Sequence, residues 1–153
     1  MNQEKIGMKG RCFVCARDAG TGKLVLGKWF DNLIVTTGRV HVAELLGGYP
    51  RRPSHIAVGT GATAPVAGNT TLGTEVFRKI ITRRRSPSAP NNYKIIFQMF
   101  LTTAEANGNT LTEAGIFNRA ALGSMLSRVT YTGIAKTSSI TVTYTWEISI
   151  TTV

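Results

Sequence analysis

The clearest alternation of hydrophobic and polar positions lies at the end of the chain, in the stretch SSITVTYTWEISITTV. Apolar side chains occupy every second position, and threonine, glutamate or serine stand between them. Because successive side chains of a strand point to opposite faces, this alternation predicts a half-buried strand. Its apolar face would carry Ile140, Val142, Tyr144, Trp146, Ile148 and Ile150.

Near the start of the chain, residues 11–18 and 23–35 are rich in β-branched and aromatic side chains. They flank the turn sequence AGTG, so together they predict a β-hairpin. The stretch TTGRVHVAELLGG that follows predicts a short helix. Thr36 or Thr37 would cap it, the two glycines would end it, and its buried face would carry Val42, Leu45 and Leu46.

In the middle of the chain, HIAV predicts a short strand, and TEVFRKIITRRRS (74–86) predicts an extended strand without a clean apolar face. YKIIFQMFLTTAEA follows after a proline-rich loop, which suggests that these two runs are neighbouring antiparallel strands. We therefore predict a mainly β fold, an antiparallel β-sandwich or jelly-roll-like single domain with one short helix. A polar N-terminal arm (1–10) would precede the β-domain (11–153).

The composition gives the chain a strong positive charge: it has 18 lysines and arginines and 8 acidic residues, for a net charge of +10. The electrostatic field of such a charge attracts polyanions, so the expected partner is acidic. An anionic glycan, an acidic protein surface and nucleic acid all fit the charge alone. The candidate charged interface comprises Arg51, Arg52, Arg78, Lys79, Arg83, Arg84 and Arg85. We do not expect nucleic acid as the partner, since no recognised nucleic-acid-binding module accompanies these residues. The alternative is that the basic residues form a solvated face or a contact between subunits.

The only two cysteines, Cys12 and Cys15, form a single C-x-x-C sequence. On an extended strand their side chains point to opposite faces, so they cannot bridge to one another. We expect them to pack as buried apolar side chains. The alternative is an inter-subunit disulfide from either cysteine, which an oxidising setting outside the cell would permit.

Two glycine-rich stretches, GTGATA and AGTGKL, resemble fragments of nucleotide-binding loops. The first continues into Pro65 rather than into a helix whose amides would bind phosphate, and the second lacks the spacing of a P-loop. His41 and His55 have no sequence partner for catalysis, and the carboxylates are scattered. We therefore expect no catalytic residues, no cofactor and no metal. No apolar run has the length of a membrane span, so we expect no membrane insertion.

The segment LTEAGIFNRAALGSMLSRVTYTGIAKTSSITVTYTWEISI, residues 111–150, carries a set of short motifs of the EAGIFN, ML-R and KTSS-TVT-TW-I type. This segment resembles the C-terminal part of a family of small structural proteins of tailed bacteriophages, often called tail-fibre-like. The glycine-threonine stretch after HIAV and the stretch FDNLIVTTGRVHVAELLGG also resemble that family. The matching positions are Glu113, Gly115, Phe117, Asn118, Met125, Leu126, Arg128, Lys136 and Trp146.

The resemblance implies a non-enzymatic virion structural protein, made in the host cytoplasm, that forms a homo-oligomer on the tail, neck or collar, or capsid surface. Its partners would be copies of itself and other virion proteins. The alternative is a receptor- or glycan-binding tail-fibre module that contacts an anionic host surface. In this resemblance the glycine stretch joins two strands and holds no nucleotide. The arginine-rich strand and the C-x-x-C sequence are not marks of the family.

Overall fold

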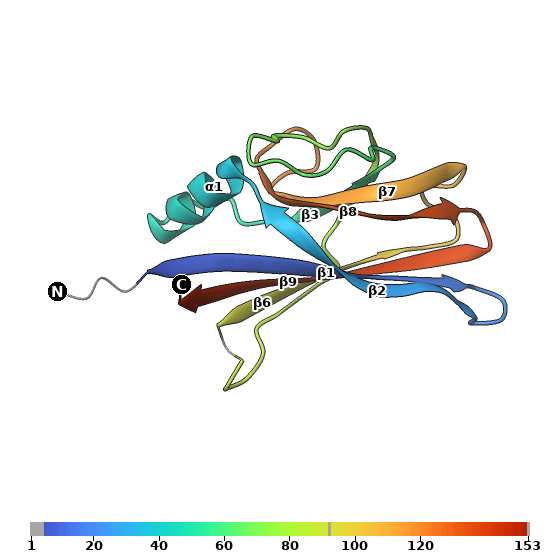
Figure 1. Cartoon of the computed structure of the whole chain (residues 1–153), viewed down its shortest axis with the longest axis horizontal. Helices are drawn as coiled ribbons and strands as arrows, with labels where there is room; N and C mark the ends of the chain where they lie inside the picture. The colour runs from blue at the N-terminus through green and yellow to red at the C-terminus, as the bar shows by residue number, and fades with distance from the viewer. Residues whose placement is uncertain (1–4, 92, 153) are drawn as a thin grey trace.

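We describe a computed structural model of the chain, covering residues 5–91 and 93–152 (Figure 1). Over these residues the chain is mainly β with one helix, as the sequence predicts, and its strands form a single antiparallel sheet. In chain order the elements of the described residues are β1 (Ile6–Asp18), β2 (Leu24–Ile34), α1 (Thr36–Leu46), β3 (His55–Gly59), β4 (Glu75–Ile80), β5 (Arg83–Arg85), β6 (Lys94–Leu101), β7 (Asn109–Phe117), β8 (Met125–Lys136) and β9 (Ile140–Thr152).

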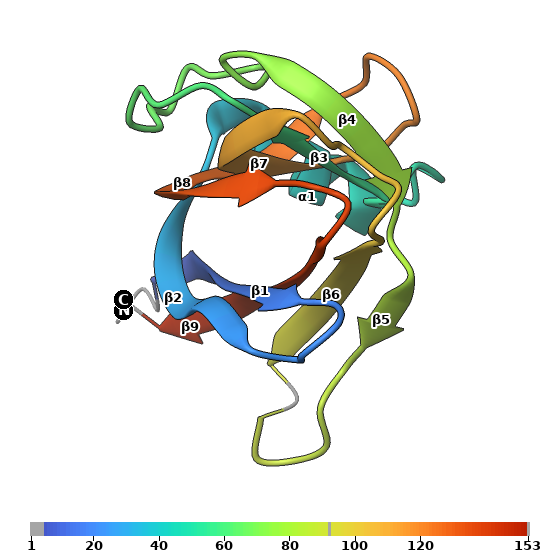
Figure 2. The same cartoon turned by 90° about the vertical axis from the view of Figure 1, so that its right-hand side faces the viewer.

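The strands of the described residues follow the order β4-β3-β7-β8-β2-β1-β9-β6-β5 and curl into two facing layers (Figure 2). The predicted mainly β, antiparallel fold is confirmed, and its two layers are halves of one continuous sheet. β2 joins them: it pairs with β1 up to Asn32 and then pairs with β8 at Leu33 and Ile34. A long, strongly twisted strand can pass from one layer to the other in this way.

The predicted hairpin is confirmed, since β1 and β2 pair antiparallel from Gly10 to Arg17. β1 begins at Ile6, so residues 6–10 belong to the sheet and not to the predicted arm. Residues 1–4 of that arm lie outside the described residues. The predicted last strand is confirmed as β9, whose alternate side chains from Val142 to Ile148 are buried between the layers.

The prediction of one strand over residues 74–86 is wrong, because the chain breaks at Ile81 and Thr82 into β4 and β5. β4 and β5 are the two opposite edges of the sheet. The Ile81 amide donates to the Ser54 carbonyl on one side, and the Thr82 amide donates to the Gln98 carbonyl on the other. Ile81 is only 4% exposed, so this crossing packs against the core and ties the two edges together. The predicted antiparallel neighbours are confirmed as β5 and β6.

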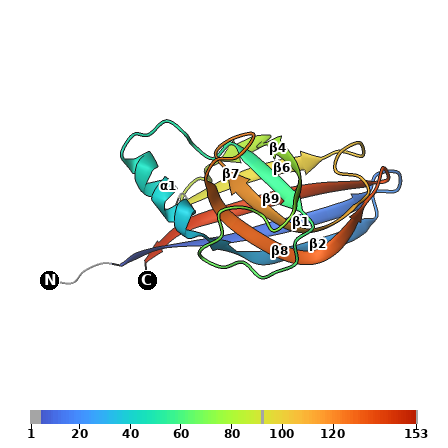
Figure 3. The same cartoon turned by 90° about the horizontal axis from the view of Figure 1, so that it is seen from above.

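Helix α1 forms where the sequence predicts it, but its cap and its buried face differ. Val35 precedes the helix without a side-chain cap, and the Thr37 hydroxyl instead donates to the Met125 carbonyl over 2.9 Å. Leu46 is 87% exposed, whereas Gly38 and His41 are buried. The helix lies against β8, and Gly38 and His41 are the residues that this contact covers (Figure 3).

Gly38→Ala will lower the free energy of unfolding by about 1–3 kcal/mol. A Cβ at this position would collide with the backbone carbonyl of Leu126, and backbone cannot move aside as a flexible side chain can. This outweighs the roughly 1 kcal/mol by which alanine favours a helix over glycine. Urea denaturation measures the change. Gly47→Ala is the control, because its nearest contact would lie at 3.4 Å; equal stability of the two variants would show that α1 does not dock through Gly38.

Candidate functional site

The layer formed by β6, β9, β1 and β2 carries aromatic side chains on its outer face, away from the other layer. Phe13 on β1 stands opposite Trp29 on β2, and their ring centroids are 5.2 Å apart. Trp29 is 38% exposed, and Phe100 on β6 is 41% exposed. We call this surface the outer strand face. It consists of Arg11, Phe13, Cys15, Trp29, Phe100, Thr143 and Thr145, which the strand register brings side by side.

Within the outer strand face, Arg11 contacts the Trp29 ring. The Arg11 guanidinium lies 4.1 Å from the centre of the Trp29 ring and also pairs with Glu147 over 2.8 Å. A cation above the face of an indole ring is attracted to the ring, and this attraction holds the ring in place. Trp29 is therefore presented as a flat, oriented aromatic surface rather than as a freely rotating side chain.

The two cysteines lie on opposite faces of β1, as the sequence predicts. Cys12 points into the core, is 0% exposed, and burial raises the pKa of its thiol well above its usual range. Cys15 is half-buried within the outer strand face, where it stands opposite Thr143. Both are free thiols. Buried packing thus describes Cys12, and of the predicted inter-subunit disulfides only one through Cys15 is compatible with the folded chain.

Two members of the candidate charged interface hold the fold together. Arg78 forms two hydrogen bonds to the Glu75 carboxylate, of 2.8 and 2.6 Å, and its guanidinium lies 3.8 Å from the centre of the Phe117 ring. Lys79 pairs with Glu105 over 2.8 Å. Because their charges are already paired, these side chains contribute little to any interaction with an external anion.

The remaining members, Arg51, Arg52, Arg83, Arg84 and Arg85, are exposed. Arg84 donates to the Pro53 carbonyl over 3.0 Å, which brings β5 beside the segment that carries Arg52. Burial and then the charge of Arg52 lower the pKa of Arg84. Burial and the charges of Arg78 and Arg84 likewise lower the pKa of His55. The structure therefore brings Arg52 and Arg84 together near His55, at one end of the sheet.

The glycine-rich stretch after β3 is a loop that wraps around one buried carboxylate. Glu113 accepts hydrogen bonds from the backbone amides of Gly61, Gly73 and Thr74, at 2.7 to 2.9 Å. Arg128 pairs with the same carboxylate over 2.8 Å, and both side chains are almost fully buried. Amides that a phosphate-binding loop would offer to a ligand are here engaged by Glu113.

Sequence reasoning missed this ion pair and noted its two members only as positions of the resemblance. A signal is present, because Glu113 begins a run of β7, Glu113 to Phe117, in which every residue is buried. A carboxylate on the apolar face of a strand requires a partner. Lys136, another resemblance position, is 1% exposed and donates to Asn107 Oδ1 and the Thr137 carbonyl. These positions thus contribute to the fold.

An open groove of about 680 Å³ lies where β2 leaves β1 to join β8. Residues Ile6 to Gly10 of β1 and Asp31 to Ile34 of β2 line it, together with Arg39 from α1. Sequence reasoning missed this groove as well, because it arises from the departure of one strand from another.

No cluster of three or more metal-binding side chains is found within residues 5–91 and 93–152. In the same part of the chain, no helix has the length and apolarity needed to cross a membrane. The sequence matches no protein-family model and no curated protein. The resemblance to phage structural proteins therefore stays a prediction.

Proposed function

We propose that this protein is a non-enzymatic structural protein that assembles with copies of itself through the outer strand face. The exposure of Trp29 and Phe100 on one regular, threonine-rich strand surface supports this proposal most strongly. Aromatic side chains on a flat pleated face bury large areas when a second surface covers them. Arg11 holds the Trp29 ring in place, so little conformational freedom is lost on contact.

The place of assembly follows from the resemblance: we propose the tail, neck or collar, or capsid surface of a bacteriophage virion. The support is the set of short motifs in residues 111–150. Several of their positions are buried anchors, among them Glu113, Arg128 and Trp146. This is the behaviour expected of motifs that specify a fold and not a reaction.

Sedimentation velocity tests the assembly. The wild-type chain will form oligomers that persist in high salt, because apolar contact does not weaken with screening while repulsion between chains of charge +10 does. The double variant Trp29→Ser/Phe100→Ser will sediment as a monomer under the same conditions. Leu122→Ser is the matched control, since Leu122 is 84% exposed but lies outside the outer strand face. A wild-type chain that stays monomeric at every concentration would refute the proposal.

The second candidate function is the contact of an anionic host glycan. The exposed arginines of β5, Arg83 and Arg85, favour it. Binding to heparin, used as an anionic probe, would then fall steeply as salt rises, and Arg83→Glu/Arg85→Glu would abolish it. Self-assembly has the opposite salt dependence, so one salt series separates the two functions.

A further inference from the structure

The groove between β1 and β2 contains an unpaired strand edge. β1 pairs with β9 along its whole length, from Ile6 to Asp18, but its pairing with β2 begins only at Gly10. Residues Ile6 to Lys9 therefore have one edge with which no strand of the described residues pairs. Four residues of strand correspond to about 13 Å of edge.

The direction of the backbone groups at this edge follows from the neighbouring strands. The Ile150 amide of β9 donates to the Tyr93 carbonyl over 3.0 Å, which points it toward β6 and away from β1. Met8 stands opposite Ile150, so this is a non-hydrogen-bonded pair of the antiparallel ladder. The N–H and C=O of Met8 consequently point into the groove, and those of Ile6, two residues earlier, do the same.

A side-chain amide inside the groove also lacks a partner. Asn32 lies directly over Gly10, so closely that a Cβ at position 10 would collide with its carboxamide. Both the oxygen and the nitrogen of this carboxamide are buried, and neither has a hydrogen-bond partner among the described residues. A carboxamide has the same donor and acceptor as a peptide group, and leaving both unpaired costs free energy that is recovered when the side chain turns toward an inserted backbone.

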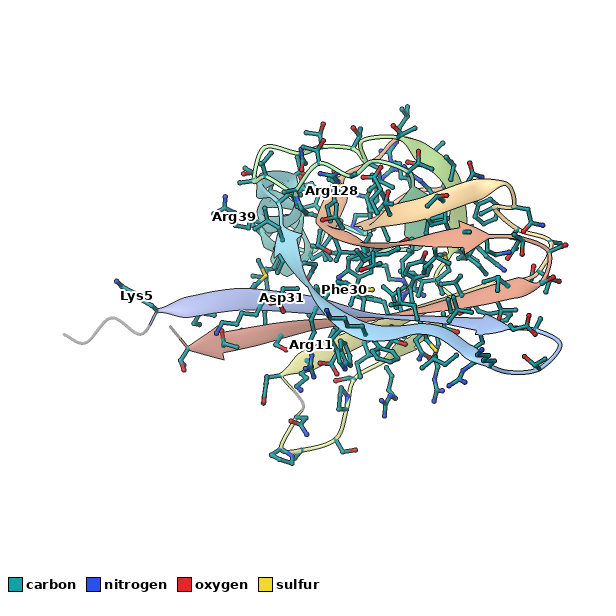
Figure 4. All side chains as sticks on the ribbon, turned by 45° about the vertical axis from the view of Figure 1, so that its right-hand side comes forward. Lys5, Arg11, Phe30, Asp31, Arg39 and Arg128 are labelled. Carbon is teal, nitrogen blue, oxygen red and sulfur yellow. The ribbon has the colours of Figure 1, made fainter. Side chains whose placement is uncertain are left out.

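The groove offers apolar contacts and a positive rim. Ile6 is 71% exposed and Leu33 is 37% exposed at its wall. Lys9 and Arg39 line the groove and are exposed, Lys5 directly precedes its first lining residue, and Asp31 is the one carboxylate among the lining residues. Figure 4 labels Lys5, Asp31 and Arg39. None of the ion pairs in the described part of the chain engages Lys9 or Arg39.

We propose that this groove binds an extended, acidic segment of a partner protein by strand addition to β1. The backbone of the segment pairs with Ile6 and Met8, its apolar side chains cover Ile6 and Leu33, and its carboxylates face Lys9 and Arg39. The local charge favours an acidic segment of a partner over a segment of a second copy, since Lys9 and Arg39 at the groove repel basic residues and this chain has 18 basic residues against 8 acidic ones. The proposal does not rest on self-assembly, which uses different residues on the outer strand face.

The test uses the full chain labelled with ¹⁵N and an end-blocked six-residue peptide of alternating valine and threonine, with aspartate at both ends. At about 1 mM the peptide will shift the backbone amide signals of Ile6 and Met8 and the side-chain amide of Asn32 in the NMR spectrum. A peptide with lysine in place of aspartate, and an aspartate peptide with N-methylated backbone amides, are the matched controls. Both will bind at least about ten-fold more weakly.

Variants at two positions locate the contact. Arg39→Glu will weaken binding of the acidic peptide about three- to ten-fold without changing stability, because Arg39 is exposed. Met8→Pro removes the amide that faces the groove and will abolish binding, whereas Met8→Ala will retain it. The proposal is overturned if none of the three amide signals shifts, if the lysine peptide binds equally well, or if the signals move with protein concentration alone, which would place a second copy in the groove.

Discussion

Glu113→Ala will lower the free energy of unfolding by about 3–5 kcal/mol, the cost of leaving a buried charge without its partner. The substitution leaves the Arg128 guanidinium, whose side chain is 3% exposed, without the carboxylate that neutralises it. It also removes the acceptor for the amides of Gly61, Gly73 and Thr74. The loop after β3 then loses its anchor to β7.

Chemical denaturation measures the loss of free energy of unfolding, and hydrogen exchange shows which backbone amides lose protection. In the variant, the amides of Gly61, Gly73 and Thr74 will exchange faster than in the wild-type chain. Arg128→Ala will cost at least about 1 kcal/mol less, because Glu113 keeps its three amide donors. Glu44→Ala, at a carboxylate that is 46% exposed, will stay within about 0.5 kcal/mol of the wild type. If Glu113→Ala stays in that range too, the carboxylate does not hold the loop.

Trp146→Ala will lower the free energy of unfolding by about 3–5 kcal/mol, since it opens a large cavity in the core. Trp146 is 0% exposed and stands in β9 between Cys12 of β1 and Phe97 of β6. These neighbours belong to rigid, paired strands that cannot collapse into the space. Thermal and urea unfolding both measure the loss.

Trp146→Phe is the informative comparison. The indole nitrogen of Trp146 is buried without a hydrogen-bond partner among the described residues, so the smaller ring removes an unfavourable group together with some packing. We expect a cost below about 2 kcal/mol. A loss as large as that of Trp146→Ala would mean that the indole N–H, and not the volume of the ring, stabilises the core.

The elements with a local signal were predictable from the sequence. β9 follows from its strict alternation, because that face is buried between the layers from Val142 to Ile148. The β1–β2 hairpin follows from its turn. The break between β4 and β5 has no local signal, because it depends on Ile81 reaching the core between two distant strands.

The candidate sites were less predictable, because they depend on which strands become neighbours. The sequence places Phe13 and Trp29 on one hairpin. It does not predict that Phe100 shares their face, because β6 joins this layer only through its pairing with β9, which lies between β6 and β1. The arginines of residues 78–85 look like one basic cluster in sequence. In the structure Arg78 is paired with Glu75 on one edge of the sheet, while Arg83 and Arg85 lie on the other.

The rate at which iodoacetamide alkylates Cys15 tests most directly whether copies cover the outer strand face. Cys15 lies within that face, while Cys12 is buried in every state of the folded chain and serves as an internal reference. We predict that the rate at Cys15, followed by mass spectrometry, falls as the protein concentration rises, and stays constant in Trp29→Ser/Phe100→Ser. A rate at Cys15 that is the same in monomers and in sedimenting oligomers would contradict the account.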